Sequence, residues 1–298
     1  MSTIFTGKRI HISGVVQGVG FRPFVYGLAA RYGLAGWVCN TSAGVDIEVD
    51  GPVDQIDRFV AALSREAPPL ARIDSIEARD TAPNGFTSFE IRQSVARPDD
   101  FMPISPDIAL CDDCRRELLD PADRRYRYPF INCTNCGPRF TIIKDIPYDR
   151  PLTTMANFVM CEDCAKEYAD PLNRRFHAQP VACPKCGPQV WVVDKHAGTQ
   201  GESTIKRSSE SAIEEVRARL ARGQIVAIKG LGGFHLACDA TNEVAVRVLR
   251  ERKGRVDKPF ALMAASVQAI ESFCEVSAEE RALLESKERP IVLLRRKA

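Results

Sequence analysis

Eight of the eleven cysteines in this 298-residue chain stand in Cys-x2-Cys pairs, a residue type and spacing suited to binding a metal ion. Two such pairs, 18 residues apart, form one pattern, and this pattern occurs twice. The spacing is typical of sites in which four thiolates bind one zinc ion. Four sulfur ligands complete a tetrahedral shell and leave no position for a catalytic water, so we predict two structural zinc sites. The expected ligands are Cys111, Cys114, Cys133 and Cys136 in the first site and Cys161, Cys164, Cys183 and Cys186 in the second.

The two cysteine patterns belong to one duplicated unit, because every cysteine of the first recurs 50 residues later together with matching neighbours. A fixed period of this kind indicates an internal repeat. Spacing favours zinc binding within each repeat, although pairing across the repeats would also satisfy a tetrahedral ion. Gly137 and Gly187, which follow the last cysteine of each repeat, are expected to allow a positive φ. His177 is not expected to be a ligand, since its counterpart in the first repeat is Arg127.

A glycine-rich segment at residues 14–22 has the sequence GVVQGVGFR, between an expected strand and an expected helix. Its glycines let backbone amides converge, and the helix N-terminus adds partial positive charge, so the segment favours an anion. Arg22, in the first turn of the helix, can donate two hydrogen bonds to phosphate oxygens. Asn40 is expected at the end of the neighbouring strand. The predicted phosphate-binding loop consists of Gln17, Gly18, Val19, Gly20 and Phe21.

These residues resemble the acylphosphatase family, whose loop ends in Gly-x-x-Phe-Arg and whose second strand carries a catalytic asparagine. The resemblance covers residues 7–92 and implies that Arg22 binds the substrate phosphate and Asn40 orients the attacking water. No histidine or carboxylate is expected beside the loop. None is required, because an acyl phosphate has a good leaving group and its own phosphate oxygen can accept the water proton. Positioning and charge stabilisation can then suffice.

A second glycine-rich turn, at 229–235, is followed by six basic and two acidic residues between 247 and 258. The string Lys-x-Arg-x-x-Lys-Pro in this region resembles the nucleotide-binding segment of YrdC-like domains, which make carbamoyl-adenylate-type intermediates from ATP. The resemblance implies that ATP, with Mg²⁺, is bound by Lys229, Lys253, Arg255 and Lys258.

Hydrophobic patterns around these motifs predict an α+β multidomain protein. Residues 1–92 show strand and helix periods in the order βαββαβ, which predicts a ferredoxin-like acylphosphatase sandwich with its helices on one face of an antiparallel sheet. A tandem four-cysteine zinc-finger domain is expected at 107–192, and a partial YrdC-like α/β domain at 205–298. In that last domain, strands are expected at 225–228, 260–264 and 291–294.

Composition limits the class of protein. Apolar residues make up 45% and charged residues 27%, typical of a globular fold, and the net charge of +2 gives no general attraction to nucleic acid or membrane. Residues 111–190 contain twelve Lys or Arg against eleven Asp or Glu, without the basic excess of a nucleic-acid-binding surface. With neither a membrane span nor a signal-peptide pattern expected, we expect a cytoplasmic protein that binds neither nucleic acid nor membrane. The alternative is a zinc-ribbon module that binds RNA or protein and keeps the acylphosphatase fold as a non-catalytic scaffold.

The order of the acylphosphatase-like domain, the duplicated zinc unit and the YrdC-like segment resembles the N-terminal part of the HypF family of carbamoyltransferases, which serve the maturation of nickel–iron hydrogenases. The strings DRPLTTM at 149–155 and KGLGGFH at 229–235 support the resemblance. It implies hydrolysis of carbamoyl phosphate, formation of carbamoyl-adenylate with ATP, and transfer of carbamoyl to a cysteine thiol of the partner HypE. The transfer would need a further C-terminal domain, so we expect the chain to be a fragment.

Overall fold

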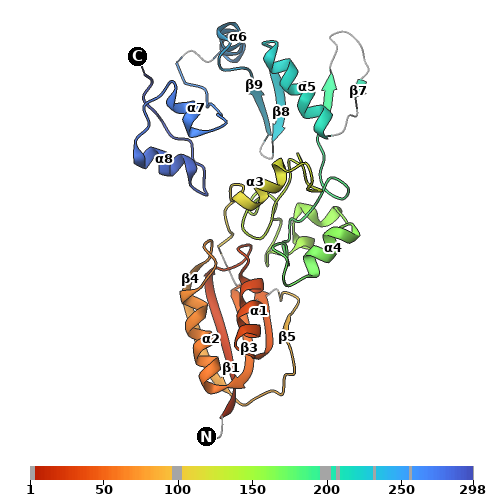
Figure 1. Cartoon of the computed structure of the whole chain (residues 1–298), viewed down its shortest axis with the longest axis vertical. Helices are drawn as coiled ribbons and strands as arrows, with labels where there is room; N and C mark the ends of the chain where they lie inside the picture. The colour runs from red at the N-terminus through yellow and green to blue at the C-terminus, as the bar shows by residue number, and fades with distance from the viewer. Residues whose placement is uncertain are drawn as a thin grey trace. The chain divides into compact units, whose positions relative to one another are not determined.

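The computed structural model describes residues 4–95, 103–194, 203–205, 209–230, 233–254 and 257–297 (Figure 1). The chain divides into two compact units. The first consists of Met1–Tyr126 and Phe130–Gly187, and the second of Arg127–Pro129 and Pro188–Ala298. The phosphate loop and both cysteine clusters therefore belong to the first unit.

The first unit begins with a five-stranded sheet covered on one face by two helices (Figure 1). Its elements are β1 (Phe5–Val15), α1 (Phe21–Arg31), β2 (Ala35–Thr41), β3 (Gly44–Pro52), α2 (Val53–Arg65), β4 (Arg72–Thr81) and β5 (Phe89–Ile91). The strand order is β4-β1-β3-β2-β5; the first four strands are antiparallel, and β5 runs parallel to β2. This confirms the predicted α+β sandwich and adds a short parallel edge strand to it.

The core of the sandwich follows from the strand and helix periods of apolar residues in the sequence. Alternate residues of β1, among them Ile10 and Ile12, are fully buried beneath the helices. Phe21, Val25 and Phe59 supply the apolar faces of α1 and α2. Burying each such side chain contributes about 1.5–3 kcal/mol. Phe21 therefore anchors the start of α1, and with it the loop that precedes this helix.

The cysteine-rich part of the first unit contains α3 (Asp112–Leu119), the short 3₁₀ turns η1 (Arg150–Leu152) and η2 (Thr154–Asn157), and α4 (Glu162–Ala169). α3 and α4 lie 50 residues apart, and each is preceded by a cysteine at its N-cap. Gly137 has a φ of 97°, as expected, but Gly187 is not among the positive-φ glycines, so that expectation is wrong for the second repeat. Instead Gly187 donates its N–H to the carbonyl of Cys183 at 2.9 Å.

The second unit has the elements β6 (Val192–Asp194), β7 (Ser203–Ile205), α5 (Ser209–Ala221), β8 (Val226–Gly230), β9 (Gly233–Ala237), α6 (Glu243–Lys253), α7 (Val267–Glu271) and α8 (Ala278–Glu285). β8 confirms the first predicted strand of this region and pairs with β9. The strands predicted at 260–264 and 291–294 are wrong: neither segment forms a strand. Apolar residues form a strand only where another strand pairs with them, and here Met263 and Ile291 stay exposed. Within the described ranges, no helix combines the length and apolar character needed to cross a membrane.

Candidate active site and metal centres

Arg22 and Asn40, the two predicted catalytic residues, lie together in the first unit. α1 starts at Phe21, which places Arg22 in its first turn, while Asn40 stands one residue before the end of β2. Both are buried, with 8% of Arg22 and 1% of Asn40 exposed. With its amide oxygen turned toward the guanidinium, Asn40 accepts hydrogen bonds from Arg22 Nε at 3.2 Å and Nη2 at 3.3 Å. The guanidinium is therefore held in one plane rather than free in solvent.

The predicted phosphate loop presents its backbone, not its side chains. Gly18 and Gly20 have φ values of 70° and 76°, in the left-handed region that favours glycine. Gly20 is the N-cap of α1 and gives it no side-chain cap, so the first amides of the helix remain available to an anion. Val19 and Phe21 bury their side chains in the core. Gln17 braces the loop, because its Nε2 donates to the carbonyls that flank the β2–β3 turn at 2.7 and 2.8 Å.

A cavity lies over this loop, and the zinc repeats form its other wall. The loop, Arg22 and Asn40 line one side, and Thr134, Arg139 and His177 are among the residues that line the other. The cavity contains about 340 Å³ of empty volume, part of it open to solvent. The cavity is small and only partly enclosed, so the site suits a small ligand rather than a polymer.

Arg139 ties the zinc repeats to the loop. Its side chain is 1% exposed, and its Nε donates to the carbonyl of Gly18. The two Nη atoms donate to four more backbone carbonyls, at distances from 2.9 to 3.2 Å. These acceptors are neutral, so none of them offsets the positive charge of the Arg139 guanidinium beside the loop. Arg139 and Arg22 together make the cavity attractive to an anion.

Asp149 and His177 also lie at this site, so the expectation that no histidine or carboxylate would stand beside the loop is wrong. Asp149 Oδ1 accepts a hydrogen bond from Arg22 Nη2 at 2.7 Å. Burial, and then the charge of Arg22, lower the pKa of His177 to about 4, so its imidazole is neutral at neutral pH. Its buried Nδ1 has no hydrogen-bond partner among the described residues. Sequence reasoning missed both residues because they are 127 and 155 positions from Arg22.

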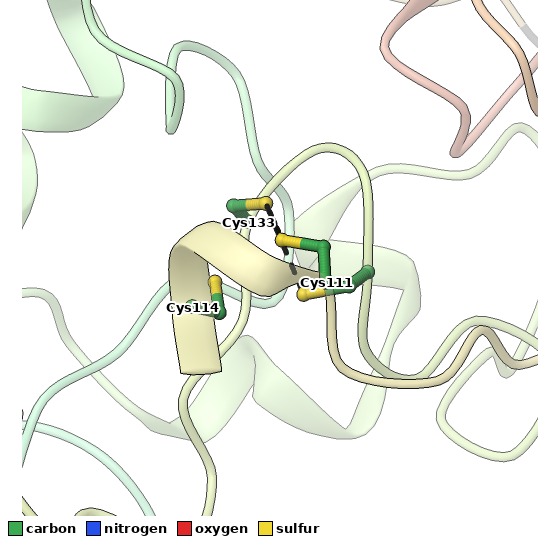
Figure 2. Close-up of side chains that lie close together, drawn as sticks. Cys111, Cys114 and Cys133 are labelled. Atoms are coloured by element: carbon green, nitrogen blue, oxygen red, sulfur yellow. Dashed lines mark hydrogen bonds between the residues drawn. The ribbon is translucent and has the colours of Figure 1, made fainter. Parts of the chain in front are cut away.

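The eight predicted metal ligands form two clusters, each drawn from a single repeat. In the first, Cys133 Sγ lies 3.7 Å from Cys111 Sγ (Figure 2). Cys133 Sγ lies 3.8 Å from Cys136 Sγ. Neighbouring sulfurs of the second cluster are 3.6–3.7 Å apart. Four sulfurs at 2.3 Å from a central zinc would stand about 3.8 Å from one another. The clusters therefore fit two tetrahedral zinc sites, each with its four cysteines from one repeat, the arrangement that spacing favoured.

Each zinc cluster is contacted by arginines of the other repeat. Arg174 donates to Cys114 Sγ at 3.1 Å, and Arg124 donates to Cys164 Sγ at 3.4 Å. Each of these arginines also donates a hydrogen bond to a glutamate one helical turn after that cysteine: Arg174 to Glu117, and Arg124 to Glu167. A zinc ion with four thiolates carries two net negative charges, so these arginines offset a charge that lies partly buried. This reciprocal contact, called the arginine clasp below, joins the repeats into one body.

The predicted nucleotide-binding residues are spread over the second unit. Lys229 lies on β8, and Lys253 is the last residue of α6. Lys258 lies in the loop that follows, and its backbone carbonyl accepts a hydrogen bond from Arg250 Nη1 at 3.3 Å. Arg255 lies outside the described residues. Their role in binding a nucleotide stays a prediction.

Family comparisons agree with this architecture. The acylphosphatase family matches residues 8–91, and the HypF finger family matches 110–143 and 160–193. The Sua5–YciO–YrdC family, described as telomere recombination, matches 218–298. The three matches fall on the sandwich, on the two zinc repeats and on most of the second unit.

Individual relatives extend over almost the whole chain. It is 54% identical over 293 residues to carbamoyltransferase HypF2 of Cupriavidus necator and 51% identical over 290 residues to carbamoyltransferase HypF of Rhizobium leguminosarum bv. viciae. Each alignment covers 97% of this chain but only 35% of the relative. The crystal structure of full-length HypF in its phosphate- and nucleotide-bound form is similar, with a TM-score of 0.90 and 49% identity over 99% of this chain and 38% of that chain. The chain thus spans little more than a third of these relatives, and it belongs to the HypF family.

Proposed function

We propose that the first unit hydrolyses carbamoyl phosphate to carbamate and inorganic phosphate. The observation that carries this proposal is the contact between Arg22 and Asn40 at the glycine-rich loop, inside a cavity sized for a small anion. Two arginines and a helix N-terminus favour a phosphate there.

The reaction needs only groups that the site presents. Loop amides and Arg22 hold the phosphate group, and Asn40 orients a water molecule toward phosphorus. The water oxygen forms a bond to phosphorus, the bond from phosphorus to the carbamoyl oxygen breaks, and carbamate leaves with the electron pair. A phosphate oxygen accepts the proton of the water. Catalysis then consists of positioning and of charge stabilisation by donors fixed in advance.

In the longer proteins of this family we propose that the carbamate continues to a second reaction. The YrdC-like unit would join it to AMP from ATP, with Mg²⁺ on the phosphates and the lysines at 229, 253 and 258 and Arg255 as nucleotide ligands. A further domain would pass the carbamoyl group to a cysteine thiol of HypE. The carbamoyltransferase names of the relatives and the phosphate- and nucleotide-bound state of the similar structure support this sequence. Thiolate zinc sites suit the reducing cytoplasm, where we place the protein.

The first step can be tested by measuring phosphate release from carbamoyl phosphate, corrected for spontaneous breakdown. We expect Arg22→Ala to lower the rate about 10²- to 10³-fold, the usual loss when a preorganised charge-stabilising donor is removed. Arg31→Ala is the matched control, because Arg31 lies on the same helix but is exposed and pairs with Glu66. Equal rates for the wild type and Arg22→Ala would favour the alternative of a non-catalytic scaffold beside a binding module.

A further inference from the structure

The phosphate-binding arginine has a charged partner that does not come from the acylphosphatase-like sandwich. Asp149 Oδ1 lies 2.7 Å from Arg22 Nη2, and the two side chains are only 22% and 9% exposed. Asp149 belongs to the segment that joins the two zinc repeats. A charge-assisted hydrogen bond of this length, largely shielded from water, restricts the orientation of both groups.

The position of Asp149 is fixed by its two neighbours in the chain. The N–H of Tyr148 donates to Gln17 Oε1 at 3.0 Å, which ties this segment to the phosphate loop. On the other side, the N–H of Arg150 donates to Gln179 Oε1 at 2.8 Å. The guanidinium of Arg150 donates to three further backbone carbonyls at 2.7–2.9 Å. Asp149 is therefore presented to Arg22 by a rigid backbone.

The contacts of Arg22 leave one edge of its guanidinium weakly held. Asn40 accepts from Nε and Nη2, and Asp149 also accepts from Nη2. Among the described residues, Nη1 has only a 3.3 Å bond to Ser94. Because the guanidinium is planar and its donors form a fixed fork, holding the Nε–Nη2 edge also aims Nη1. A phosphate oxygen can replace Ser94 without disturbing the other bonds.

We infer that Asp149 is a positioning residue for Arg22, so that the zinc repeats complete the acyl-phosphate site. This inference rests on the function proposed for the cavity. Asp149 acts in two separable ways. Its oxygen fixes the direction of the guanidinium, which speeds the reaction, and its charge partly offsets that of Arg22, which weakens the hold on product phosphate.

Two substitutions separate these effects. Asp149→Ala removes both the acceptor and the charge, and we expect kcat for carbamoyl phosphate to fall about 10- to 100-fold. Asp149→Asn keeps an acceptor oxygen and removes the charge. It should retain kcat within about fivefold and bind inorganic phosphate about 3- to 10-fold more tightly. Asp145→Asn, the same change at an exposed position of the same segment, should alter neither quantity.

The measurements are kcat and KM for carbamoyl phosphate, calorimetric binding of inorganic phosphate, and zinc content for each variant. A kcat of Asp149→Ala within twofold of the wild type would overturn the inference. So would an Asp149→Asn protein that is as slow as Asp149→Ala, or one with unchanged phosphate affinity. Loss of zinc from both variants would indicate a merely structural role and would also overturn it.

The result is distinguishable from failure of the proposed function. If Arg22→Ala loses activity and Asp149→Ala does not, only the present inference fails. If Arg22→Ala is as active as the wild type, the proposed function fails. Phosphate binding needs no turnover, so it still decides whether Asp149 acts on Arg22 in that case.

Discussion

The arginine clasp predicts that Glu117→Gln will weaken both zinc repeats, although Glu117 is not a zinc ligand. Glu117 lies on α3 of the first repeat and accepts hydrogen bonds from Arg174 and Arg175 of the second. Burial alone would raise the pKa of this carboxyl group, but the bonds from the two arginines outweigh burial and lower the pKa to about 2. The carboxylate is therefore stabilised by its partners in the other repeat.

The magnitude follows from that pKa. A drop in pKa from 4.5 to about 2 corresponds to about 3.5 kcal/mol at about 1.4 kcal/mol per unit. Solvent screening of a side chain that is 24% exposed lowers this to about 1–2 kcal/mol. The side chain of Arg175, only 4% exposed, would also lose its charged partner, which adds a further cost. We expect a total destabilisation of about 2–3 kcal/mol.

The assay follows zinc release with a colorimetric chelator during urea unfolding. Glu117→Gln should lower the urea concentration at which both ions are released, because the clasp joins the repeats. Glu167→Gln, the equivalent change in the second repeat, should have a similar effect, since Glu167 pairs with Arg124 and Arg125 at 2.5 Å. Glu90→Gln is the control: its pair with Arg92 is exposed, and such pairs contribute about 0–1 kcal/mol. If the release midpoint of Glu117→Gln matches that of Glu90→Gln, the clasp does not stabilise the zinc sites.

Two further predictions concern the metal and pH. Elemental analysis should find two zinc ions per chain. Removing them with a strong chelator should unfold the repeats, because structural zinc supplies folding free energy. A single ion per chain, or an apoprotein whose far-UV circular dichroism spectrum is unchanged, would contradict this prediction. His177 has a folded pKa of about 4 against an ordinary 6.5, so the unfolded state binds more protons between these values. Its contribution to stability is complete above pH 6.5 and is lost as the pH falls toward 4, by at most about 1.4 kcal/mol per unit. Urea unfolding from pH 7 to 5 should show a shallower pH dependence in His177→Gln than in the wild type, and equal slopes would refute the assignment.

Local patterns predicted the parts of the molecule that depend on short stretches of chain. Cysteine spacing identified both zinc clusters, because two residues between ligands already direct the two sulfurs to one ion. The alternation in β1 and the helical period of α1 predicted the sandwich. Arg22 and Asn40 could be paired before the structure through the resemblance to acylphosphatases, which carry an arginine at the end of the loop and an asparagine on the second strand.

Tertiary contacts explain what the sequence did not reveal. Asp149 opens the string DRPLTTM, but that string does not indicate which residue it contacts, and only the packing of the zinc repeats against the phosphate loop brings it to Arg22. The predicted strands at 260–264 and 291–294 are wrong for a related reason: an apolar run in the sequence does not indicate whether another strand will pair with it.

One signal in the sequence could have indicated the second wall of the cavity. The two repeats have the same residues at the zinc ligands and at the arginine clasp, because both repeats use these residues to hold their structure together. They differ at positions that line the cavity: among these, Thr134, Arg139 and His177 correspond to Pro184, Gln189 and Arg127. The turn at 127 and 177 has the same left-handed backbone in both repeats, with φ of 54° and 53°, so the side chain alone changed. Duplication supplied a frame with two four-cysteine clusters, and departures from the repeat supplied residues that line the cavity.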